Sequence, residues 1–144
     1  MFDMLDAELE NVIMQNMDIM YISTIDIEMR ARDFFFKVWN FLLGNKEKCL
    51  AYVRYYYSPY FGTYSVEAHR ERFKSVVEKF KPVFIDEANV WLIMNHILNV
   101  MLDFAIKVHN NQMPSNDNYA EHIFRVTYRS VEQYYKKEEV KNNE

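Results

Sequence analysis

Glycine, proline and cysteine are all scarce in this sequence of 144 residues, which has 2 Gly, 3 Pro and a single cysteine, Cys49. One cysteine excludes a disulfide framework and a cysteine-based metal site. Because turn formers are few and 50% of the residues are hydrophobic, we expect long elements, short connections and one domain over 1–144. The low cysteine content favours a reducing, cytoplasmic setting.

An excess of positive charge is also missing. Lys and Arg number 17 against 21 Asp and Glu, which gives a net charge of -4 with no basic cluster. Affinity for the phosphate backbone comes from clustered Lys and Arg, so the chain itself is a poor candidate for nucleic-acid binding.

Signals for secretion or membrane insertion are not evident either. The opening MFDMLDAELE is acidic, whereas a signal peptide begins with basic residues and then turns apolar. The most apolar window, 90–108, carries Asp103 and Lys107, and each costs about 2.5–3.5 kcal/mol at the centre of a bilayer. We therefore predict that this window is a buried helix and not a membrane span.

Known catalytic motifs are absent from the sequence: it has no glycine-rich phosphate loop, no Gly-x-Ser-x-Gly and no His-Glu-x-x-His. Cys49 has apolar neighbours and is predicted to be a small buried hydrophobe. No catalytic residue is assigned, and the chain is not expected to be an enzyme.

No two of the four histidines, His69, His96, His109 and His122, are spaced for joint metal binding on one helix turn. His96 and Asp103 share a helix face, which leaves open a metal-dependent helical-bundle enzyme completed by a distant histidine. Such a stripe more often forms hydrogen bonds or lines a pocket. We assign no metal and no cofactor.

The hydrophobic periodicity is helical throughout, and no alternation typical of a strand persists. We therefore predict an all-α bundle of about six helices. Their expected spans are 2–20, 26–43 with Asp26 as cap, 45–58, 65–80 with Ser65 as cap, 86–109 with Asp86 as cap, and 117–136. The polar tail, 137–144, is expected to fray.

The fifth and sixth predicted helices suggest a homodimer. The fifth is apolar nearly all round, and such a helix must be covered nearly all round. A second copy of the chain would supply the cover, since two-fold dimers are the commonest soluble oligomers. The sixth is expected to bury Ala120, Ile123, Phe124, Val126, Thr127 and Val131.

The stretch YVRYYYSPYFGTYS, 52–65, concentrates six tyrosines. Tyr52, Tyr55 and Tyr56 are spaced to share one helix face. A tyrosine buries its ring while its hydroxyl still needs a partner, which suits either a seam between core and solvent or the wall of a pocket. A stacking surface for nucleic acid is a third interpretation, but basic residues do not alternate with these rings.

Five sequence segments, in this order along the chain, resemble those of a known family: FFFKVWNFLLGN, KCLAYVRYYYSPYF, FKPVF, LIMNHILNVMLDFAIKVHNNQMP and AEHIFRVTYRSV. Over roughly 34–135 the chain resembles the C-terminal domain of tetracycline-repressor-like (TetR/AcrR) bacterial transcriptional regulators. The similarity is greatest to a branch of the family whose sequences contain the motifs YYYSPYF and LDFA.

The resemblance implies a function. In that family the last two long helices, here 87–109 and 117–136, form a four-helix dimer interface. The helices before them enclose a pocket for a small effector, commonly apolar or aromatic. The first helix, 2–20, would be the connector to a DNA-binding domain, and effector binding would shift it and change the spacing of two recognition helices.

Residues for each role follow from this hypothesis. The candidate pocket residues are Trp39, Tyr52, Tyr55, Tyr56, Phe73, Asn95, Asn99 and Asp103. The candidate dimer-interface residues are Trp91, Met94, Leu98, Met101, His122, Arg125, Val126 and Arg129.

One departure from the family is large. Its members carry a helix-turn-helix domain before the connector, and this sequence contains none. We expect the chain to be the sensor part of a longer regulator, which binds operator DNA only through an N-terminal domain absent here. A natural protein without a DNA reader remains open, as does a protein–protein interaction module that dimerises without an effector.

Overall fold

The computed structural model describes residues 2–137, and it describes side chains from Leu5 onward. Those residues form seven α-helices and no named strand. The helices are α1 (Phe2–Gln15), α2 (Ile27–Leu43), α3 (Lys46–Tyr56), α4 (Pro59–Tyr64), α5 (Val66–Phe80), α6 (Val90–His109) and α7 (Asp117–Val131). Three 3₁₀ turns complete them: η1 (Met17–Tyr21), η2 (Lys81–Val83) and η3 (Glu132–Tyr134). The predicted all-α class is confirmed, and the tail 138–144 lies outside the described residues.

Four predicted spans, those of the first, third, fifth and sixth helices, are wrong in detail. The first helix does not continue to residue 20, because the chain tightens into η1 after Asn16, whose side-chain amide donates to the Val12 carbonyl at 2.8 Å. The third helix ends at Tyr56 instead of 58. Pro59 is the first residue of an additional helix, α4, where its missing N–H leaves no hydrogen bond unmade. The sixth helix ends at Val131 instead of 136, because Tyr135 turns extended and pairs with Phe84.

Side-chain caps explain where the helices start. Asp26 caps α2 as predicted, accepting from the Glu28 N–H at 3.2 Å. Asp86 does not cap the fifth helix, because Asn89 accepts from the Leu92 N–H at 3.0 Å and α6 starts at Val90. Ser65 makes no cap bond, and its hydroxyl instead lies 3.0 Å from the Tyr55 hydroxyl.

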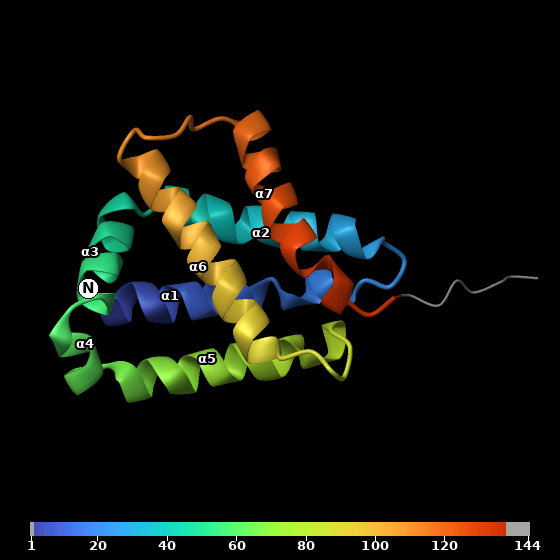
Figure 1. The fold of residues 1–144 in the computed structure, drawn as a ribbon, viewed down its shortest axis with the longest axis horizontal. Helices are drawn as coiled ribbons and strands as arrows, with labels where there is room; N and C mark the ends of the chain where they lie inside the picture. Colours follow the sequence, from blue (N-terminus) through green and yellow to red (C-terminus); the bar gives the residue numbers. More distant parts are fainter. Residues whose placement is uncertain (1, 138–144) are drawn as a thin grey trace, which may run out of the picture.

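The helices pack around one cluster of buried side chains. In Figure 1, α1, α2 and α5 run side by side, α6 crosses over them, and α7 lies against α2 and α6. The buried Arg30 fixes the turn between the first two helices, donating to the carbonyls of Met20 at 2.8 Å and Ile25 at 2.7 Å. Cys49 is fully buried, as expected for a small core residue.

α6 is only partly covered by the rest of the chain. It is the one helix among the described residues that is long and apolar enough to cross a membrane by length and composition, and 28% of its most apolar stretch is buried. One such helix is weak evidence of a membrane protein. Here α6 also packs against α2, α3, α5 and α7, so it is an integral part of the bundle.

Candidate functional site

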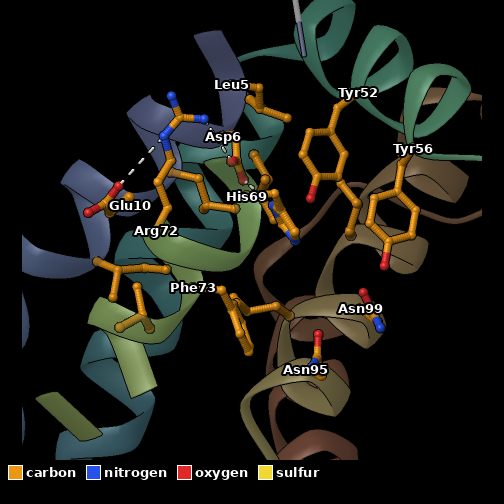
Figure 2. A pocket seen from close by; sticks show the side chains of 16 residues that line it. Leu5, Asp6, Glu10, Tyr52, Tyr56, His69, Arg72, Phe73, Asn95 and Asn99 are labelled. Atoms are coloured by element: carbon orange, nitrogen blue, oxygen red, sulfur yellow. Dashed lines mark hydrogen bonds and ion pairs between the residues drawn. The ribbon is translucent and has the colours of Figure 1, made fainter. Parts of the chain in front are cut away.

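A cavity opens between α1, α3, α5 and α6, and we call it the polar cavity (Figure 2). Its lining residues come from all four helices and from Leu42 of α2: Leu5, Asp6, Leu9, Glu10, Ile13, Leu42, Tyr52, Tyr56, His69, Arg72, Phe73, Val76, Asn95, Leu98, Asn99 and Leu102. The empty space is about 660 Å³ including the part open to solvent, and about 50 Å³ admits the centre of a water-sized molecule. A buried water needs roughly 10–15 Å³ by that measure, so the cavity has room for a few waters.

An ionic cluster forms one wall of the polar cavity. The Asp6 side chain is 7% exposed, and its two oxygens accept from His69 Nδ1 at 2.8 Å and from Arg72 Nη1 at 3.0 Å. Arg72 Nε also lies 4.0 Å from a Glu10 carboxylate oxygen. A buried carboxylate is tolerated when hydrogen bonds and charge compensate its lost hydration, so this cluster holds α1 against α5.

Stacked rings form a second wall. The Tyr52 and Tyr56 rings of α3 are stacked with centroids 5.9 Å apart, and the His69 and Phe73 rings of α5 are stacked at 6.2 Å. Burial raises the pKa of Tyr52 well above its ordinary value, and the nearby Asp6 charge adds to the shift. The Tyr52 hydroxyl therefore stays neutral at physiological pH and acts as a hydrogen-bonding group.

The third wall is a face of α6. Asn95 and Asn99 are one turn apart there, and a carboxamide can both donate and accept hydrogen bonds. Figure 2 shows the Tyr56 hydroxyl and the Asn99 side chain pointing toward one another. The cavity thus combines aromatic faces with a few convergent polar groups, which is typical of small-molecule sites.

Five of the eight predicted pocket residues meet in this cavity: Tyr52, Tyr56, Phe73, Asn95 and Asn99. They come from three different helices, so the tertiary fold brings them together.

The other three predicted pocket residues lie elsewhere. Asp103 lines a neighbouring groove beside Asn99 and pairs with Lys107 at 2.7 Å. Trp39 is 2% exposed and stacks on Phe35 in the core. Tyr55 turns away to Ser65, so neither Trp39 nor Tyr55 lines the polar cavity.

The ionic wall was not predicted from the sequence. Asp6 and Glu10 interrupt an apolar stripe of α1 at a spacing of one turn, and His69 and Arg72 do the same beside Phe73 on α5. Each pair carries a local signal, since charged residues seldom occupy the buried face of a helix. Their meeting depends on tertiary packing across 63 residues, which local spacing does not predict.

A second cavity, the apolar cavity, lies between α2, α5, α6 and α7, with about 530 Å³ of empty space including the part open to solvent. Its walls are almost entirely apolar or aromatic, and the Thr127 hydroxyl on its lining donates to the Ile123 carbonyl at 2.8 Å. Burial raises the pKa of Tyr128, also on the lining, to about 12, so that phenol stays neutral.

The predicted dimer-interface residues divide into two groups. Met94 and Met101 are each 2% exposed inside the chain's own core, so that part of the prediction is wrong. Leu98 is half-buried and lines both cavities.

The other predicted interface residues lie on the surface: Trp91, His122, Arg125, Val126 and Arg129. Among them, Trp91 is 41% exposed and Val126 is 61% exposed. Val126 was expected to be buried by the last helix, and its exposure corrects that expectation.

The metal interpretation gains no support from the geometry. His96 is exposed and bonds the Ser130 hydroxyl at 3.0 Å, while Asp103 pairs with Lys107. Within residues 2–137, no three His, Cys, Asp or Glu side chains are grouped to hold a metal ion. The described residues that line the polar cavity also include no Ser, Thr or Cys, the nucleophiles that a His–Asp pair activates.

Comparison of the chain with protein-family models, curated proteins and solved structures finds no match. The resemblance to the C-terminal domain of TetR-like regulators therefore remains an expectation drawn from the sequence motifs.

Proposed function

We propose that this chain is the effector-binding and dimerising domain of a transcriptional regulator similar to the TetR-like family, and that it acts in the cytoplasm. The observation that carries the proposal is the place of α1 in the polar cavity. Asp6 of this first helix sits between His69 and Arg72, so a molecule bound there touches the helix that would lead to a DNA reader.

The mechanism would be a shift between two positions of α1. A ligand changes such an equilibrium only by binding one position better than the other. A molecule that wedges between Asp6 of α1 and Tyr56 of α3 would favour an α1 displaced from α3. Any helix-turn-helix would be attached at the start of α1, and the described helices by themselves would not bind operator DNA.

Dimerisation would use the outer faces of α6 and α7. Trp91 and Leu92 on α6 and Val126 on α7 are exposed apolar side chains, 41%, 64% and 61% accessible. A two-fold contact between two copies would cover them, and it would place the two α1 helices in a fixed relation.

A ligand screen by thermal unfolding of the full chain tests the effector role, because a ligand that binds only the folded form raises the melting temperature by mass action. Small aromatic and apolar compounds are the first set. Tyr56→Ala and Asn99→Ala should weaken any hit about tenfold, while Tyr60→Ala, at an exposed position away from the cavity, should not. Hits unaffected by the first two variants would place the ligand elsewhere.

The alternative is a dimer that binds another protein and no effector. The exposed tyrosines just before and on α4 favour this alternative: Tyr57, Tyr60 and Tyr64 are 80%, 63% and 76% exposed. Tyrosine is enriched at protein interfaces. A screen with no hit, together with loss of partner binding in Tyr60→Ala and Tyr64→Ala, would support this alternative.

A further inference from the structure

The two cavities lie in line along the same helices. On α5 the polar cavity is lined by Phe73 and Val76, and the apolar cavity begins one turn further at Phe80. In the first part of the chain, Ile13 lines the polar cavity and Met20, in η1, lines the apolar cavity. The second space therefore continues the first along the bundle.

Leu98 stands between them. It lies on α6 and is the one described residue that lines both cavities. On one side it is flanked by Asn95 and Asn99 of the polar cavity, and on the other by Met94 and Met101 of the apolar cavity. Its side chain is half-buried, so its rotation needs no opening of the deep core.

The walls of the apolar cavity are adaptable. Met20, Met94 and Met101 contribute to its lining, and an unbranched methionine side chain repacks around different shapes. About 40 Å³ of the space admits the centre of a water-sized molecule. A slender chain that displaces these side chains suits this space better than a rigid multi-ring compound.

The charges of the polar cavity select against an anion. Asp6 and Glu10 bring two negative charges, and Arg72, which lies within ion-pair distance of both, brings one positive charge. His69, 2.8 Å from Asp6, adds a second positive charge only when its ring is protonated. While His69 is neutral, an added carboxylate or phosphate faces net negative charge in a partly desolvated space. A hydroxyl, an amide or an ammonium group finds hydrogen-bond acceptors and aromatic faces there instead.

From these observations we propose that the ligand is a single-chain amphiphile with a non-anionic headgroup. The headgroup occupies the polar cavity beside Asn95 and Asn99, and the hydrocarbon chain passes Leu98 into the apolar cavity. This inference rests on the proposed effector-binding function and specifies the class of effector.

The first test uses n-alkyl ligands from hexyl to tetradecyl with three headgroups, alcohol, trimethylammonium and carboxylate, each below its micelle concentration. Affinity for the full chain is measured by calorimetry. We expect about fourfold tighter binding per added methylene until the apolar cavity is filled. The carboxylates should bind at least tenfold more weakly than the other two series. Equal affinity across chain lengths, or tightest binding by the carboxylates, would overturn the proposal.

The second test changes the residue between the cavities. Leu98→Phe should remove the gain from longer chains and leave the hexyl ligand almost unaffected, whereas Leu98→Ala should bind the longest chains at least as well as the unsubstituted protein. Ile22→Phe is the control, because it makes a similar change at a side chain that is 41% accessible and lines neither cavity. If affinity depends on alkyl-chain length in both Leu98 variants as it does in the unsubstituted protein, the alkyl chain of the ligand does not pass Leu98 and the proposal is wrong.

The two levels of the hypothesis fail differently. No binding by any alkyl ligand, together with Tyr56-dependent binding of a compact aromatic compound, would refute the amphiphile and leave the effector function standing. No binding by either class would refute both. The chain-length series on the unsubstituted protein decides the matter even where a Leu98 variant does not fold.

Discussion

Asp6 is one of only four polar or charged residues buried in the described part of the chain, with Arg30, Ser65 and Thr127. An acidic side chain is rarely buried unless it is paired. Both Asp6 oxygens are used, one by His69 and one by Arg72. At the scale of the single residue, this carboxylate links α1 to α5 and shapes the polar cavity.

We predict that Asp6→Asn lowers the free energy of unfolding by about 2 kcal/mol. The amide keeps the shape of the side chain but removes the negative charge opposite Arg72 and one of the two acceptors. The loss is below that of a fully buried ion pair, because Arg72 is 29% exposed and His69 is 19% exposed. Urea unfolding followed by circular dichroism measures the change.

Glu78→Gln is the control, since Glu78 and Lys81 form an ion pair in which both side chains are more than half exposed. Exposed pairs contribute little, so its effect should stay within about 0.5 kcal/mol. If both variants lose the same small amount, Asp6 does not hold α1 in the way described.

Cys49 gives a prediction on pH dependence. Burial raises the pKa of its thiol to about 11, against roughly 8.5 in an unfolded chain. Between these values the unfolded chain has lost the proton and the folded chain keeps it, so stability falls as pH rises and is fully retained below the unfolded pKa. The urea midpoint should therefore decrease from about pH 8 to about pH 9.5, below the range where most tyrosines titrate.

Cys49→Ala isolates the contribution of the thiol. This variant is expected to be less stable at every pH because it loses buried volume, but its midpoint should depend less on pH over the same range. An equal pH slope in both proteins would show that other groups cause the decrease.

At the scale of the helix, the caps make the next prediction. Asn89→Ala and Asn116→Ala should each cost about 1 kcal/mol, because each side chain accepts from an N–H in the first turn of its helix. Chemical denaturation measures both. Asp86→Ala should change stability by less than about 0.5 kcal/mol, since Asp86 is exposed and three residues before the observed cap. A larger loss at Asp86 than at Asn89 would place the start of α6 earlier.

At the scale of the whole molecule, the open question is what covers α6. We predict a particle of twice the chain mass of 17.5 kDa at micromolar concentration, measured by light scattering. Leu92→Glu and Val126→Glu together should reduce it to one chain without unfolding it, because both side chains are more than half exposed in the single chain. Tyr60→Glu, equally exposed on α4, should leave the mass unchanged. A single-chain mass for the unsubstituted protein would contradict the dimer.

The sequence by itself determined the local part of this structure. Helical periodicity set the all-α class, and a short-range signal, Asp26, set the start of α2, because these interactions lie within a few residues along the chain. Where two local signals competed, as between Asp86 and Asn89, spacing alone chose the wrong one.

Only the tertiary structure decided which faces meet. Met94 and Met101 turn inward, Val126 turns outward, and Asp6 reaches His69 across 63 residues. Burial and charge pairing depend on the elements packed against a face, and that information is spread over the whole chain. The apolar stripe of α6 could thus be predicted, whereas its division between two cavities and an exposed surface could not.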